Sequence, residues 1–172
     1  MGTEVALVGV NTIKFGACGT NGTMGTTLTA IGIIVPDSVL LTLEAPEKID
    51  IFVEDFAFPF LSIPDPDMVQ GFEFSSRDVS PANLVKGLGG TTATTKWTQA
   101  TSVALIEQSI EITSKVSGGK YYKVNIPRAN IRGSLEGKFV GKDTATLKFT
   151  CDILQPVNAT MVAQPAITIE QL

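Results

Sequence analysis

The sequence has no histidine and only two cysteines, Cys18 and Cys151, in 172 residues. The missing histidine excludes Ser/His and Cys/His nucleophile pairs and zinc sites that use histidine, and two cysteines are too few for a Cys₄ zinc site. The sequence also lacks a G-x-x-x-x-G-K-[ST] phosphate loop and a G-x-G-x-x-G motif after a strand. We therefore expect no enzymatic activity, no metal and no cofactor.

Charge is scarce as well, since only 17% of the residues are charged, against the usual ~25%. The formal net charge of −4 gives no general attraction to a polyanion, so sequence-specific nucleic-acid binding is not expected. No window approaches the ~18 uncharged apolar residues of a membrane span, and residues 1–14 do not resemble a signal peptide. We expect synthesis in a cytoplasm, where both thiols stay reduced.

The sequence is rich in glycine, threonine and β-branched residues, which is typical of sheet proteins and predicts an all-β fold. The clearest pattern covers residues 131–153, where apolar and polar residues alternate on both sides of a Gly-Lys-Asp turn. This alternation predicts a hairpin with one buried and one solvated face. One short helix is predicted over 80–88, with Ser80 as N-cap, Pro81 at the first helical position and Gly87 just after the end.

Further strands are expected over 12–16 and 103–113, where apolar residues alternate with polar ones. Residues 28–34 and 38–43 are expected to pair with each other across a Pro-Asp turn. Residues 121–127 are expected to form a strand that ends at its final proline. The other segments are expected to be an N-terminal arm over 1–11, a Gly-rich loop over 16–27 and an extended C-terminal arm over 156–172.

Residues 46–70 form the most unusual segment, which we expect to be a long assembly loop. Six of the nine phenylalanines lie within residues 52–74, together with three prolines that exclude a regular helix or a central strand. Just before them, Ile49, Ile51 and Val53 alternate with other residues at strand periodicity. The segment is too apolar to stay in water and too interrupted by proline to be core sheet, so we expect it to pack against another surface.

Opposite charges are concentrated in two segments. Residues 44–78 hold nine acids and two bases, a net charge of −7, and residues 113–148 hold eight bases and two acids, a net charge of +6. Within one subunit these charges would form surface ion pairs, whereas across subunits they would steer assembly, and both arrangements fit the sequence. The residues that we expect at a self-association contact are Phe56, Phe58, Phe60, Leu61, Asp65, Asp67, Lys138 and Lys142.

Three carboxylate pairs are candidates for glycoside hydrolysis or calcium binding: Glu54/Asp55, Asp65/Asp67 and Glu107/Glu111. Glycoside hydrolysis needs two carboxylates placed across a sugar, and calcium needs six to eight oxygen ligands; sequence spacing establishes neither arrangement. We interpret these acids as solvated side chains. Trp97 and the phenylalanines offer stacking surfaces for bases or sugars, but the surrounding acids repel phosphate.

Three stretches follow the Phe-rich segment in a distinctive order: GFEFSSRDVSPANLVKGLGG at 71–90, SIEITSKVSGGKYYKVNIPRANIRGSLEGKF at 109–139 and KDTATLKFTCDILQPV at 142–157. They contain a capped helix with a Gly-Gly exit, an Ile-Pro-Arg-Ala step at 126–129 and a last hairpin that runs into a proline. With these motifs in this order, residues 12–157 resemble bacteriophage tail tube (major tail) proteins. None of the motifs is a catalytic signature.

This resemblance implies a β-sandwich or open barrel with one short flanking helix, a long loop and extended terminal arms. It implies hexameric rings whose sheets join around a lumen and which stack into a tube that conducts DNA during ejection. The implied partners are further copies of the chain and the tape measure, baseplate or tail-tip and tail terminator proteins, with a sheath if the tail is contractile. DNA would pass without sequence-specific binding. The implied location is the virion tail, after assembly in the bacterial host cytoplasm.

Two other functions fit the sequence. One is another tail, baseplate or head–tail completion protein of the same fold. The other is a carbohydrate-binding β-sandwich, in which Trp97 and the aromatic residues of 52–74 would form a platform for sugars. The absence of a recognisable signal peptide argues against the second of these.

Overall fold

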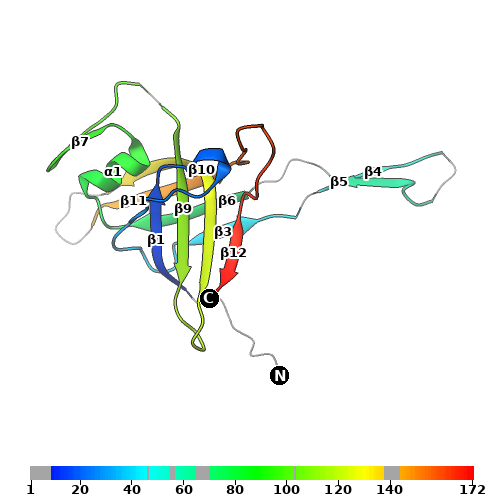
Figure 1. Cartoon of the computed structure of the whole chain (residues 1–172), viewed down its shortest axis with the longest axis horizontal. Helices are drawn as coiled ribbons and strands as arrows, with labels where there is room; N and C mark the ends of the chain where they lie inside the picture. Colours follow the sequence, from blue (N-terminus) through cyan, green and yellow to red (C-terminus); the bar gives the residue numbers. More distant parts are fainter. Residues whose placement is uncertain (1–8, 46, 55–56, 65–69, 103, 138–143) are drawn as a thin grey trace.

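The computed structural model describes residues 9–45, 47–54, 57–64, 70–102, 104–137 and 144–172. These residues form mostly β-sheet with one α-helix, as the composition predicts (Figure 1). The elements are β1 (Val10–Gly16), a 3₁₀ turn (Thr20–Gly22), β2 (Thr29–Ala30), β3 (Leu40–Leu43), β4 (Lys48–Ile51), β5 (Leu61–Pro64), β6 (Gln70–Ser76), α1 (Pro81–Leu88), β7 (Thr91–Ala93), β8 (Lys96–Thr98), β9 (Ile106–Ser114), β10 (Tyr122–Glu136), β11 (Thr146–Ile153) and β12 (Thr168–Gln171).

One eight-stranded antiparallel sheet dominates the structure, in the order β2-β1-β9-β10-β11-β6-β3, with β12 also paired to β10. The long strand β10 accounts for this branching. Its first part, Tyr122–Asn125, pairs with β12, and its second part, Ala129–Glu136, pairs with β11. In Figure 1, β11 and β6 therefore cross behind β1, β9 and β10 rather than continuing in the same plane.

The two ends of this sheet are joined by residues 31–35. The Ile31 N–H donates to the Ile13 carbonyl on β1 at 2.8 Å, and the Val35 N–H donates to the Ser75 carbonyl on β6, also at 2.8 Å. A short segment thus bridges β1 and β6, and the sheet curves around one core.

The centre of the core is a cluster of three fully buried phenylalanines. Phe15 on β1 meets Phe74 on β6 and Phe149 on β11 edge to face, with ring centroids 5.7 and 5.5 Å apart. Phe74 and Phe149 stack with centroids 4.7 Å apart. Because Phe15 comes from one side of the curved sheet and the other two rings from the opposite side, the cluster holds the two sides together.

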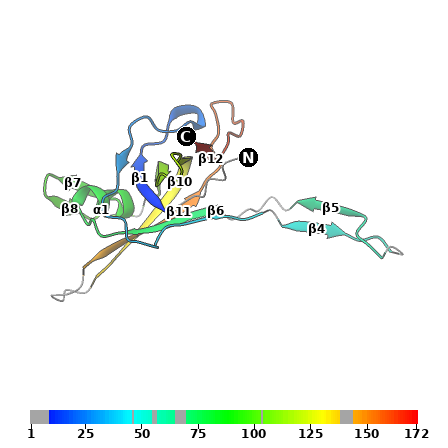
Figure 2. The ribbon, with the colours of Figure 1, turned by 90° about the horizontal axis from the view of Figure 1, so that it is seen from below.

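The hairpin predicted over 131–153 is present as the second part of β10 with β11. Ile131 lies opposite Cys151 and Leu135 lies opposite Leu147. The predicted apolar face is confirmed around Ile131, Leu147 and Cys151, which are buried, but Leu135 is 46% exposed. The hairpin therefore extends beyond the core at its outer end (Figure 2).

The expected pairing of 28–34 with 38–43 is wrong. Within the first segment, β2 pairs with β1, and Ile34 forms a single bridge with Ser76. Within the second segment, β3 pairs with β6. The turn between the two segments carries the chain from one end of the sheet to the other, so sequence proximity did not identify the partners.

The expectation that Pro127 ends its strand is also wrong, because β10 continues through it to Glu136. The pairing of β10 with β9 shifts register between Ile126 and Ala129, which is a β-bulge. A residue in a bulge needs no ladder hydrogen bond from its nitrogen, so proline is tolerated there. The Pro127 carbonyl accepts a hydrogen bond from the Ser109 hydroxyl at 2.6 Å.

Helix α1 occupies the predicted range 80–88, and only the prediction that Gly87 follows its last residue is wrong. Ser80 is at the N-cap without a side-chain capping bond, and the helix ends at Leu88, with Gly89 in the left-handed region at φ 71°. Gly87, predicted as the residue after the end, is instead a buried helical residue. It lies so close to Gly133 on β10 that a Cβ added to Gly133 would be 2.7 Å from the Gly87 carbonyl carbon.

The terminal segments differ from the expected arms. Residues 1–8 of the proposed arm 1–11 lie outside the described residues, and Val10 already belongs to β1. In the expected arm 156–172, Val157 bridges to Ala163, and β12 pairs with β10 of the same chain. The C-terminal strand is thus part of the protein's own sheet.

Candidate self-association interface

Strands β4 and β5 form a two-stranded antiparallel ribbon within the segment expected to be a long loop at 46–70. The ladder pairs Lys48 with Pro64, Ile49 with Ile63, Asp50 with Ser62 and Ile51 with Leu61. Both views show the ribbon extending away from the main sheet (Figures 1 and 2). The expectation of a loop is wrong for Lys48–Ile51 and Leu61–Pro64, which form strands. Of the alternating residues, Ile49 and Ile51 lie in β4, and Val53 lies beyond its end.

The two faces of this ribbon differ in chemistry because opposed residues share a face and successive residues alternate. One face carries the Lys48–Asp50 ion pair at 2.9 Å and a hydrogen bond from the Ser62 hydroxyl to the Asp50 carboxylate. These two bonds lower the pKa of Asp50. The opposite face, called the aliphatic face below, consists of Ile49, Ile51, Leu61 and Ile63, which are 40–52% exposed.

The ribbon tip, residues 52–54 and 57–60, adds exposed aromatic side chains. Phe58 is 80% exposed, Phe60 65% and Phe52 63%. The ladder continues by one bond into the tip, because the Phe60 N–H donates to the Ile51 carbonyl at 2.8 Å. The predicted contact residues Phe58, Phe60 and Leu61 thus all lie on the ribbon: Leu61 belongs to its aliphatic face, and Phe58 and Phe60 belong to its tip.

Other predicted residues have different outcomes. Phe56, Asp65, Asp67, Lys138 and Lys142 lie outside the described residues. Two more phenylalanines of the same run, Phe72 and Phe74, are fully buried in β6. The aromatic run is therefore divided between the ribbon and the core.

The ribbon has little support from its own chain. Within the described residues, β4 and β5 pair only with each other. An isolated two-stranded ribbon is at best marginally stable in water, and a contiguous exposed apolar patch on a protein usually marks an interaction site. The contact residues predicted from the sequence do not include Ile49, Ile51 and Ile63, although the alternation of isoleucines was a signal for them.

Within the described ranges, one ion pair joins the two oppositely charged segments. Lys148 on β11 lies 3.3 Å from Glu73 on β6, an exposed pair of low stabilising value. Three other bases of the basic segment pair with acids outside residues 44–78: Lys123 with Glu111, Arg128 with Glu107 and Arg132 with Asp152. On the described part of the ribbon and the chain leading to it, Glu44, Glu47 and Glu54 are exposed.

Of the candidate carboxylate pairs, Glu107/Glu111 is the one whose two acids both lie within the described residues, and both form ion pairs rather than standing free in solvent as expected. Asp55, Asp65 and Asp67 lie outside the described residues, and Glu54 is exposed. Two hydrogen bonds from Arg128, each 2.9 Å, lower the pKa of Glu107. Burial tends to raise the pKa of Glu111, but ion pairs with Lys14 and Lys123 outweigh burial and lower it. Both acids therefore stay charged at neutral pH and stabilise the sheet.

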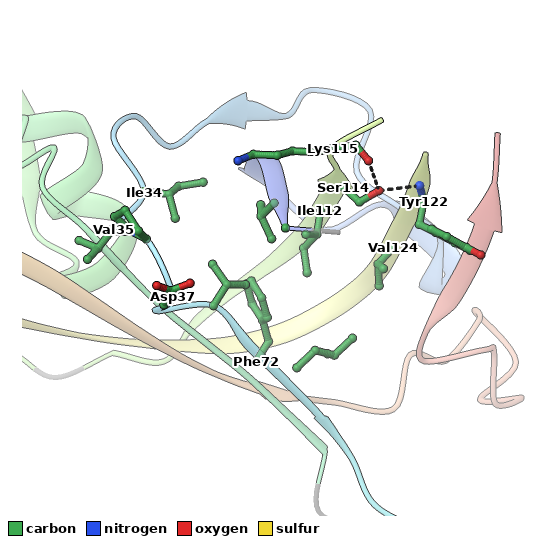
Figure 3. A pocket seen from close by; sticks show the side chains of 14 residues that line it. Ile34, Val35, Asp37, Phe72, Ile112, Ser114, Lys115, Tyr122 and Val124 are labelled. Carbon is green, nitrogen blue, oxygen red and sulfur yellow. Dashed lines mark hydrogen bonds between the residues drawn. The ribbon is translucent and has the colours of Figure 1, made fainter. Parts of the chain in front are cut away.

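An apolar groove opens at one end of the core. Helix α1 packs against β10 and β11, and the groove lies at the Ser114 end of β9, with a volume of about 430 Å³. Phe72, Ile112 and Val124 point toward one another across it (Figure 3). The Ser114 hydroxyl on its wall is satisfied, because it donates to the Lys115 carbonyl and accepts from the Tyr122 N–H.

Trp97 lies far from the ribbon. It belongs to β8, next to α1, at the opposite side of the molecule in both views (Figures 1 and 2). The indole is half-buried against the core and donates a hydrogen bond to the Gly89 carbonyl at 2.8 Å. Trp97 and the ribbon aromatics therefore do not form one platform.

Within the ranges that the structure describes, no group of three or more Cys, Asp or Glu side chains is placed to hold a metal ion. No helix in the described part of the chain is long and apolar enough to cross a membrane. No protein-family model matches the chain, and a search of curated proteins finds no significant match.

Proposed function

We propose that this protein is a structural virion subunit that self-associates through the β4–β5 ribbon into rings, six copies per ring, which stack into a phage tail tube that conducts DNA. The observation that carries the proposal is the ribbon, whose aliphatic face and aromatic tip are exposed on an element with little support from its own chain. The order of motifs over 12–157 supplies the tail-tube assignment. The curved sheet supports this assignment, because the resemblance to tail tube proteins implies a β-sandwich or open barrel.

The expected strength of one ribbon contact favours a repeating assembly over a dimer. Burying a half-exposed aliphatic side chain contributes roughly 1 kcal/mol, so the four residues of the aliphatic face contribute about 4 kcal/mol. Association costs about 4–15 kcal/mol in lost translational and rotational freedom. The aliphatic face alone therefore binds weakly, and stable association needs the tip contact as well as several ribbon contacts made together, as in a closed ring.

The charge distribution fits passage of DNA. The net charge is −4, so the subunit as a whole does not attract phosphate. In the proposed assembly the partners are tape measure, tail-tip or baseplate and tail terminator proteins, with a sheath in a contractile tail, and the location is the virion tail. The same surface would also serve another tail or head–tail component that forms one ring without stacking.

The test is negative-stain microscopy of the concentrated protein and of two variants. Wild type is expected to form hollow rings and tubes. Ile49→Glu combined with Ile63→Glu places charge on the aliphatic face and is expected to abolish them. Lys48→Gln, on the polar face of the same strand, is the control and should assemble normally. Wild-type protein that stays monomeric, or that binds glycans as a monomer, would refute the proposal, and single rings that never stack would favour the non-stacking component.

A further inference from the structure

The proposed function leaves open which surface receives the ribbon. We propose that the apolar groove at the Ser114 end of the core receives the ribbon tip of a second copy, with the phenyl ring of Phe58 seated inside. This inference rests on the proposed self-association but is more specific, because it names both contacting surfaces.

The size of the groove fits aromatic rings. A cavity of about 150 Å³ holds one benzene molecule, so the groove of about 430 Å³ has space for two phenyl rings. Its walls offer mainly carbon, from Ile34, Val39, Leu41, Phe72, Ile112 and Val124. Phe58 and Phe52 at the ribbon tip are 80% and 63% exposed, so transfer of their rings from water into an apolar groove would be favourable.

The geometry requires that the ribbon come from another copy. The ribbon extends away from the sheet (Figures 1 and 2). The groove is lined by residues 34–41 and by side chains of the sheet strands (Figure 3). The two surfaces are different, so each copy can donate its ribbon to one neighbour and receive a ribbon from another. Such head-to-tail contacts generate rings or open stacks.

The charges at the two surfaces are complementary. Lys115 stands exposed at the groove rim, and Lys120 is exposed on the adjoining turn, so these two bases outnumber the one acid that lines the groove, Asp37 (Figure 3). Glu54 is exposed on the ribbon tip, next to Phe52 and Val53. An acidic tip approaching a basic rim is steered toward the groove, and the apolar contacts then hold it.

Disulfide trapping tests the contact directly in the full-length chain. One preparation carries Cys18→Ser and Phe58→Cys, and a second carries Cys18→Ser and Val39→Cys, so that the trapped bond forms only between copies. Cys151 is fully buried and stays out of the reaction. Mild oxidation of the mixture is expected to give a covalent dimer in high yield.

The matched control replaces Val39→Cys with Leu105→Cys. Leu105 is 75% exposed and precedes β9, at the end of the strand remote from the groove. No dimer above background is expected from it. Equal trapping with both partners, or no trapping with Val39→Cys, would overturn the inference.

Charge reversal gives an independent measure. Lys115→Glu is expected to slow assembly about tenfold, as is Glu54→Lys, and the two changes in one chain should restore much of the rate. Lys96→Glu, an exposed lysine of β8, is the control and should leave the rate unchanged. If the protein forms tubes but the Phe58→Cys and Val39→Cys preparations give no disulfide, the groove contact alone is refuted. If the disulfide forms but the protein makes no tubes, the groove contact is supported and the tube is refuted.

Discussion

Replacing Phe149 by alanine is expected to be among the most destabilising single changes in the sheet. Phe149 is fully buried on β11, stacked on Phe74 at 4.7 Å and edge-on to Phe15 at 5.5 Å. Its ring also lies against α1, since a Cβ on Gly87 would be 3.0 Å from it. The change therefore opens a cavity where both sides of the curved sheet and the helix meet.

The magnitude follows from this burial. Truncating a buried phenylalanine to alanine costs about 3–5 kcal/mol, and we expect a value toward the upper end because two aromatic contacts are lost. For a domain of this size, each kcal/mol lowers the Tm by roughly 2–4 °C. The Tm should thus fall by about 6–20 °C.

The assay is urea and thermal unfolding at concentrations where the protein is monomeric, with Lys148→Ala as the control. Lys148 is the preceding residue, has a side chain 47% exposed and pairs with Glu73 at 3.3 Å. Loss of such a pair costs about 0–1 kcal/mol. If Lys148→Ala were as destabilising as Phe149→Ala, or more so, the assignment of the buried face would be wrong.

Three further changes test other parts of the structure. Gly133→Ala is expected to cost about 1–3 kcal/mol in unfolding assays, because its Cβ would lie 2.7 Å from the α1 backbone, whereas Gly71→Ala, whose nearest neighbour would be 3.8 Å away, should cost less. Glu111→Gln should lower stability by about 1–3 kcal/mol at pH 7. The pKa of Glu111 is lower in the folded than in the unfolded protein, so its stabilisation exists above the unfolded pKa and is lost as pH falls through the folded pKa. The unfolding free energies of wild type and Glu111→Gln should therefore converge in acid. A difference that stays constant with pH would contradict this. Burial raises the pKa of both thiols, so a thiol reagent at pH 7 should label the partly buried Cys18 slowly and Cys151 only after unfolding, and rapid labelling of two thiols in the native protein would refute the packing.

Local patterns in the sequence predicted local structure well. The alternation at 131–153 identified a hairpin because one of its faces is buried along most of its length. Ser80 and Pro81 located the start of α1 because these residues suit the first helical positions. Gly87 was misplaced because its small size serves close packing against Gly133, and composition alone does not separate that role from a helix end.

Features that depend on distant parts of the chain were not predictable in the same way. The pairing of β2 with β1 and of β3 with β6 depends on where residues 31–35 cross the core. The phenylalanine run looked uniform in sequence, yet Phe72 and Phe74 fill the core while Phe58 is exposed. The groove combines residues from β3, β6, β9 and β10, and no short motif could have indicated it.

The bridge at residues 31–35 also determines how the molecule would respond to force. Three backbone hydrogen bonds hold the ends of the sheet together: Ile31 to Ile13, Val35 to Ser75 and Arg77 to Ile33. By contrast, β9 and β10 share a ladder of backbone pairs that runs from Thr113 to Ile106. Tension across the ends would load the few bonds of the bridge one after another, while the long ladder distributes its load over many. Rupture would therefore begin along the bridge and expose Phe15 to water before the remaining strands separate.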